Sequence, residues 1–188
     1  MAAAALVVTA GAASAAPVQT LCPGTVGTGD REFTVTIEGP TAAGCVLWGA
    51  GNTDTPVNAA LIDAANGAAS LLDKTDSVGA SGVVITATGI SALSGLWSIV
   101  VPSGFSLTNA FLALKSGNGQ LDPDWALFSI PNGILSGSWS ITNGSQSLSH
   151  ISLYGTLVPA AIPLPAAGFL LLGALGGLAA LRRRRKAV

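Results

Sequence analysis

His150 is the only histidine of the chain and therefore the first candidate for a general base. A catalytic triad would also need a serine and a carboxylate, but such a set can be composed from any chain this rich in serine. The sequence contains no Gly-x-Ser-x-Gly elbow, no phosphate-binding loop and no His-Glu-x-x-His zinc motif. Because His150 lies in an alternating run at 148–154, we expect a strand histidine that hydrogen-bonds a neighbouring strand or turn, and no enzymatic activity.

Asp122 and Asp124 form a pair of carboxylates on either side of Pro123. Glycosidases hold two carboxylates on opposite sides of the scissile bond at a set separation, which a single intervening proline does not provide. The spacing favours two side chains that cap a turn, and a contribution to a Ca²⁺ site is the alternative. We predict no metal centre and no cofactor.

Tryptophan is frequent for a chain with one tyrosine and five phenylalanines; the four are Trp48, Trp97, Trp125 and Trp139. On the face of a β-sandwich, exposed indoles would stack on sugar rings, and nearby carboxylates and amides would orient the sugar hydroxyls. The competing interpretation is core packing, because each tryptophan lies within or at the edge of a predicted strand. We favour core packing and keep sugar stacking as the alternative.

The scaffold that must position these residues has an apolar alternation with a period of two. In segment 33–38, apolar residues alternate with Thr34, Thr36 and Glu38, which is typical of a half-buried strand. The predicted strands are 33–38, 45–48, 83–88, 96–101, 105–114, 125–130, 139–142 and 148–154, separated by turns rich in Gly, Pro and Asn. This spacing predicts an all-β fold, an antiparallel β-sandwich, with a jelly-roll-like form left open. Segment 58–72 is expected to be a loop with one or two helical turns.

The chain before residue 159 is acidic. Arg31, Lys74 and Lys115 oppose nine carboxylates there, which gives a net charge of −6. Three scattered cations form no phosphate-binding face, so nucleic acid is not an expected partner.

Segment 1–15 is predicted to be a signal peptide. An apolar run of mostly alanine leads to Ala13-Ser14-Ala15, whose small residues suit cleavage after Ala15. No Lys or Arg precedes the apolar run, which indicates either a start placed downstream of the natural one, the interpretation that we favour, or a weak signal. The expected partners are the Sec machinery and signal peptidase.

Export explains the two cysteines, Cys22 and Cys45. An even pair in an oxidising compartment favours one disulfide, and closing a loop of about 23 residues is worth about 3 kcal/mol in the chain-entropy model. A metal site would need more ligands than this pair supplies.

The C-terminal segment 159–188 has three parts. The motif Ile162-Pro163-Leu164-Pro165-Ala166 precedes an uncharged apolar run at 166–181, and the basic cluster Arg182-Arg183-Arg184-Arg185-Lys186 follows. As a helix the run would reach about 24 Å, short of a ~30 Å hydrocarbon core, and snorkelling arginines narrow the gap. The cations are expected to stay in the cytoplasm, with everything N-terminal on the far side of the membrane.

This order of motif, apolar helix and basic cluster resembles the VPLPA-CTERM sorting signal, a variant of the PEP-CTERM class of Gram-negative bacteria, with Ile162 in place of the usual Val. The resemblance implies that an exosortase, a membrane protease-transpeptidase, cuts the tail. Four internal segments, 101–105, 113–119, 136–139 and 148–154, are also similar to segments that recur in exported proteins of this class. No catalytic role attaches to them.

The sequence therefore predicts a signal peptide at 1–15, a β-sandwich domain at 16–158 and a sorting signal at 159–188. We expect a non-enzymatic protein, held transiently in the inner membrane and then placed on the outer surface or in the extracellular matrix. The alternative is a carbohydrate-binding module on the same scaffold, which the association of the family with exopolysaccharide favours.

Overall fold

The computed structural model describes residues 16–23, 30–53, 57–58, 69–77, 79–117 and 121–160. The predicted signal peptide, the sorting motif, the apolar run and the basic cluster lie outside these residues. No helix among the described residues is long and apolar enough to cross a membrane. The chain divides into two compact units, Met1–Val158 and Pro159–Val188, and the sandwich described below belongs to the first.

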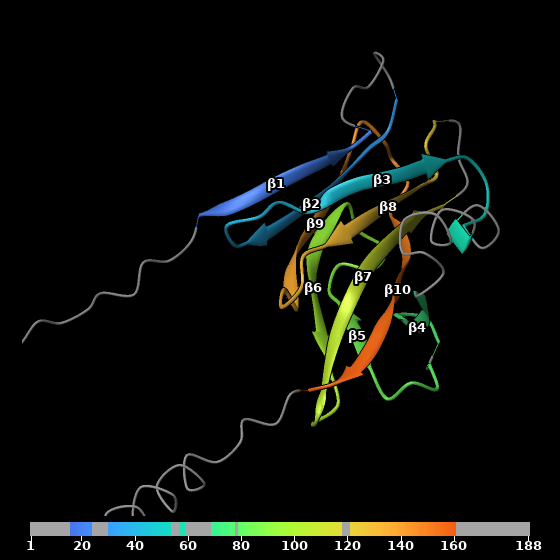
Figure 1. Ribbon diagram of the computed structural model, residues 1–188. Coiled ribbons are helices and arrows are strands. Elements are labelled where there is room, and N and C mark those ends of the chain that lie inside the picture. Colours follow the sequence, from blue (N-terminus) through green and yellow to red (C-terminus); the bar gives the residue numbers. More distant parts are fainter. Residues whose placement is uncertain are drawn as a thin grey trace, which may run out of the picture. The chain divides into compact units, whose positions relative to one another are not determined.

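The described chain is all-β, as the sequence predicts, with strands in two antiparallel sheets (Figure 1). The strands are β1 (Pro17–Cys22), β2 (Glu32–Glu38), β3 (Gly44–Gly49), β4 (Ser70–Lys74), β5 (Val84–Ala87), β6 (Ser94–Val100), β7 (Phe105–Ser116), β8 (Trp125–Ile130), β9 (Ser136–Thr142) and β10 (Leu148–Pro159). Sheet A has the order β1-β2-β9-β6-β5, and sheet B has the order β3-β8-β7-β10-β4. The predicted β-sandwich is confirmed at this level.

Two strands were not expected from the sequence, and one of them corrects the interpretation of segment 58–72. Its last residues enter β4, which pairs with the long strand β10 through Ser152 and Lys74. The alanines of the segment would permit a helix and Asn66-Gly67 suggested a loop instead, but pairing with a distant strand decides the conformation of its last residues. The other unexpected strand is β1, which pairs along its whole length with β2. Residues 59–68 of the expected loop lie outside the described residues.

The main core lies between the two sheets and follows the predicted alternation. Phe33, Val35 and Ile37 of β2 are fully buried, whereas Glu38 is exposed. They belong to one apolar cluster with inward-facing residues of sheet B such as Leu112. Successive side chains of a strand point to opposite faces of the sheet, so every second residue of β2 belongs to this cluster.

Sheet B also carries a second apolar cluster. Phe111 and Ala113 of β7 alternate with the core residues, and they pack with Trp125, Tyr154 and Val57. The middle of sheet B is therefore buried on both faces. The outer face of sheet A is more polar and partly exposed.

Candidate functional site

Two neighbouring inner strands of sheet A, β6 and β9, share one sequence motif. Strand β6 reads Ser-Gly-Leu-Trp-Ser-Ile-Val and strand β9 reads Ser-Gly-Ser-Trp-Ser-Ile-Thr. The strands are antiparallel neighbours in a register that places Gly95 opposite Trp139, and Trp97 opposite Gly137. Each indole thus lies beside a glycine of the other strand. We call this pair of strands the Gly-Trp ribbon.

The glycines of the ribbon are required by close packing. A Cβ atom on Gly137 would lie 2.4 Å from the backbone oxygen of Thr36 and 2.8 Å from the Trp97 ring. A Cβ atom on Gly95 would lie 2.0 Å from the backbone oxygen of Thr88 and 2.9 Å from Trp139 Nε1. Both indoles are almost fully buried, so a small residue opposite each one makes room for it in the core.

The outward face of the same ribbon carries hydroxyl groups. The register Leu96↔Ser138 and Ser98↔Ser136 sets these side chains side by side on the solvent face, and Ser138 pairs in turn with Thr36 of β2. A depression of about 720 Å³ lies over this face. Its hydroxyl-bearing lining residues are Thr36, Thr86, Thr88, Ser98, Ser136 and Ser138. We call it the sheet A depression.

The hydroxyls of the depression are partly ordered by one another. The Oγ atoms of Thr86 and Ser98 are 2.7 Å apart, and the Leu96 backbone N–H donates to Thr88 Oγ1 at 2.9 Å. Leu96 is 61% exposed within this polar surface, and Leu135 of the β8–β9 connection adds a second exposed apolar side chain. Glu38 is the one charged residue among those that line the depression.

The strongest electrostatic feature of the described residues is a buried cluster around Arg31, at the start of β2. The guanidinium, which has no exposed surface, donates to Ser116, to Gln146 and to the backbone oxygen of Pro123, and it lies 3.4 Å from Asp124 Oδ1. Asp124 Oδ2 also accepts from the Gly51 backbone N–H at 2.7 Å. One arginine therefore connects β2 of sheet A with the ends of β7 and β8 of sheet B.

A second buried cation lies beside this cluster. Lys115 is 6% exposed, and its Nζ donates to the backbone oxygen of Ser116 at 2.6 Å. Burial lowers the pKa of Lys115, with Asp124 acting in the opposite direction and Arg31 adding to the lowering. The cluster serves packing and charge pairing at the end of the sandwich.

His150 lies in β10 and contacts both other residue types of a hydrolytic triad. Its Nδ1 is 3.4 Å from Asp76 Oδ2 and 3.3 Å from Ser149 Oγ. A triad needs the nucleophile and the carboxylate on opposite ring nitrogens, whereas both groups approach Nδ1 here. Asp76 is about half exposed, and its carboxylate also lies 3.7 Å from Lys74 Nζ. Lys74, Asp76 and His150 therefore form a polar group at the surface.

The tryptophans are divided between core and surface. Trp97, Trp125 and Trp139 are each at most 2% exposed, whereas Trp48 of β3 is 48% exposed. Stacking on a sugar needs an open ring face, which the three buried indoles do not offer. The stacking alternative is left with Trp48, outside the sheet A depression.

Asp122 and Asp124 lie in different environments. Asp124 is buried in the Arg31 cluster, while Asp122 is exposed and contributes its backbone oxygen to the Arg31 N–H at 2.7 Å. The Asp124 carboxylate thus binds residues distant in sequence. Among the described residues, no group of three or more His, Cys, Asp or Glu side chains is arranged to hold a metal ion.

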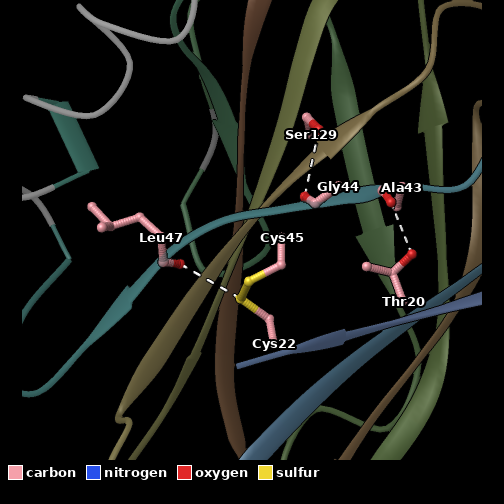
Figure 2. The surroundings of a disulfide bond; sticks show 7 residues. All are labelled: Thr20, Cys22, Ala43, Gly44, Cys45, Leu47 and Ser129. Atoms are coloured by element: carbon pink, nitrogen blue, oxygen red, sulfur yellow. Dashed lines mark hydrogen bonds between the residues drawn. A yellow bond between two sulfur atoms is a disulfide. The ribbon is translucent and has the colours of Figure 1, made fainter. Parts of the chain in front are cut away.

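The predicted disulfide is present and joins the two sheets (Figure 2). Cys22 ends β1, an edge strand of sheet A, and Cys45 lies in β3, an edge strand of sheet B, with their Cα atoms 5.3 Å apart. Thr20 Oγ1 donates to the backbone oxygen of Ala43 at 2.8 Å beside it. The bond closes one side of the sandwich.

The sequence interpretation missed the sheet A depression and the Arg31 cluster. A signal for the first was present, because Ser-Gly-x-Trp-Ser-Ile occurs twice and such a repeat suggests two equivalent neighbouring strands. No local signal marks Arg31, whose partners come from three distant segments.

Comparison with protein-family models, with characterised proteins and with solved structures finds no match to this chain.

Proposed function

We propose that this protein is a non-enzymatic component of the cell surface or extracellular matrix of a Gram-negative bacterium, exported and then processed at its C-terminus. The observation that carries the proposal is the order of the tail: the 162–166 motif, an apolar run and a terminal basic cluster. Each part alone is common, but the three parts in this order are specific to a sorting signal.

The three parts of the tail have separate roles in this proposal, and these roles support processing over permanent anchoring. The arginines fix the orientation, and the apolar run holds the protein in the inner membrane. Pro163 and Pro165 deny the backbone a regular helix next to the membrane and leave an extended segment that a protease can bind. A permanent anchor would need no prolines at that place. The partners in this scheme are the Sec machinery, signal peptidase and an exosortase-type protease.

Two features of the sandwich support the rest of the proposal. The Cys22–Cys45 disulfide suits a small domain in an oxidising compartment. The contacts of Asp76 and Ser149 with the same nitrogen of His150 favour a structural role for that histidine.

We further infer a jelly-roll-like wrapping of the sandwich. Strands β2, β9 and β6 are successive neighbours in sheet A, and β3, β8 and β7 are successive neighbours in sheet B. The connections β2–β3, β8–β9 and β6–β7 thus carry the chain between the sheets side by side. Such wrapped ribbons are typical of jelly rolls.

The test is C-terminal peptide mass spectrometry of protein released from the surface of native cells. The expected result is a chain that ends near Pro163-Leu164-Pro165-Ala166. Changing Pro163 and Pro165 to alanine should trap uncleaved precursor in the inner membrane, whereas changing Arg182 to Arg185 to serine should disturb retention or orientation first. Recovery of an intact 170–188 tail on released protein would contradict the sorting proposal.

A further inference from the structure

We propose that the sheet A depression binds an uncharged polysaccharide chain. This inference rests on the proposed function, because an exported protein meets such polymers outside the cell. It is carried by the lining of the depression, which combines hydroxyl groups, exposed aliphatic side chains and almost no charge.

The functional groups of the depression match those of a sugar. A sugar presents hydroxyls around its ring and C–H groups on its faces. Serine and threonine hydroxyls both donate and accept, so they can pair with sugar hydroxyls in either role. Leu96 and Leu135 offer apolar surface for the C–H faces, and Glu38 at the border is a strong acceptor that orients a hydroxyl.

The domain carries a net charge of −6, yet a single carboxylate lines the depression. A polyanion would be repelled by the body and would find no cation among the lining residues. A polycation would be drawn to carboxylates elsewhere on the surface. Electrostatics therefore favours a neutral ligand at this depression over a polyanion or a polycation.

The depression is broad. The lining residues come from β1, β2, β9, β6 and β5 and from adjoining connections, so the depression runs across neighbouring strands about 4.8 Å apart. A floor of this breadth suits several consecutive sugar units better than one. Because the face is hollow, two copies of it cannot close on each other without leaving a void, which disfavours a second copy of this chain as the occupant.

The Gly-Trp ribbon gives this floor its rigidity. The indoles of Trp97 and Trp139 are buried in the core behind this face, and Gly95 and Gly137 pack so closely against backbone oxygens that not even one added Cβ atom would fit. The outward hydroxyls are therefore held in place before any ligand arrives, which lowers the cost of ordering on binding.

The experiment measures retention of the purified full-length protein in native gels that contain a polysaccharide. The panel consists of neutral polymers (dextran, β-1,3-glucan, galactomannan and soluble cellulose) and one polyanion, alginate. The expected result is retardation by at least one neutral polymer and none by alginate. Retardation by alginate alone, or by no polymer of the panel, would overturn the inference.

Two matched variants locate the site. Ser138→Glu places a charge in the centre of the depression and should weaken retention about tenfold or more. Ser94→Glu, on the outer face of the same ribbon but outside the lining residues, should leave retention unchanged. The unfolding midpoint of each variant shows that it is folded. Equal retention by Ser138→Glu and the wild type would place binding elsewhere and refute the site.

Failure of this inference can be told apart from failure of the proposed function. Ser138→Glu leaves residues 162–166 and the basic cluster untouched, so C-terminal processing in cells should proceed normally. Loss of retention with normal processing supports the site. Normal processing without retention in the wild type refutes the site and leaves the sorting proposal standing.

Discussion

The outer faces of the two sheets have opposite characters. The outer face of sheet B carries a second apolar cluster, in which Phe111, Trp125 and Tyr154 are buried. The outer face of sheet A carries serine and threonine rows and a depression open to solvent. Both sheets share one core, so the difference lies in what covers each of them. Sheet B contributes to the scaffold on both faces, and sheet A leaves open the face at which we propose binding.

This difference also appears in how each sheet tolerates change. At its end, sheet B encloses charged groups, Lys115 and Asp124, which depend on their partners. The Gly-Trp ribbon of sheet A depends on shape, because glycine backbones face the two indoles. We therefore expect sheet B to be most sensitive to loss of a partner, and sheet A to the addition of an atom.

The largest effect is expected for Asp124→Ala. Removing this carboxylate leaves the fully buried Arg31 without its anionic partner and also removes the attraction on Lys115. Breaking one partner of a buried ion pair costs about 3–5 kcal/mol. The measurement is the free energy of unfolding in denaturant.

The matched control for this variant is Asp76→Ala. Asp76 also pairs with a cation, Lys74, but at the surface, where the Asp76 side chain is 48% exposed. An exposed pair contributes about 0–1 kcal/mol, so the control should unfold nearly as the wild type does. If both variants lost the same stability, the contrast between the buried cluster and the surface would be wrong.

A slightly smaller effect is expected when the link between the sheets is removed. In Cys22→Ala the unfolded chain is no longer closed over the 23-residue separation, which should cost about 2–4 kcal/mol. Peptide mapping without reductant should show one linked pair in exported protein. Two alkylatable cysteines in that material would contradict the disulfide.

The next prediction addresses the Gly-Trp ribbon directly. Gly137→Ala would put a methyl group 2.4 Å from a backbone oxygen that cannot move freely, so overpacking should cost about 1–3 kcal/mol. Gly117→Ala is the control, because its nearest neighbour would be 3.7 Å away. A Gly137→Ala variant as stable as that control would show that the ribbon adjusts to an extra atom.

What the sequence predicts well is set by local pattern. Alternation identified β2 and its buried Phe33, Val35 and Ile37, and the even cysteine pair identified the disulfide between the sheets. These inferences need only the period of a strand and the redox compartment. Eight of the observed strands overlap the predicted ones for the same reason.

What the sequence does not predict depends on pairing between distant segments. Strand β4 forms because β10 lies beside it, and Arg31 is buried because its partners converge from the end of β7, the residue before β8 and the β9–β10 connection. The burial of Trp97 and Trp139 follows from the register that sets each against a glycine. A strand assignment leaves this register open, so composition alone left core packing and sugar stacking as competing interpretations.

The smallest effect concerns Lys115 and the pH dependence of stability. Burial lowers the pKa of Lys115 below its ordinary value of 10.5, so between the two values the folded state binds fewer protons than the unfolded state. The free energy of unfolding therefore rises with pH across that window. Below the window Lys115 is charged in both states, and its full desolvation cost remains.

Lys115→Met removes this titration, so the wild type should gain stability relative to the variant as the pH approaches 10.5. The measurement is denaturant unfolding at a series of pH values. Lys74→Met, which removes a partly exposed lysine, controls for the loss of one positive charge. A difference between wild type and Lys115→Met that stayed constant or moved the other way would show that the lysine is solvated, and that the charged end of sheet B is less enclosed than its burial implies.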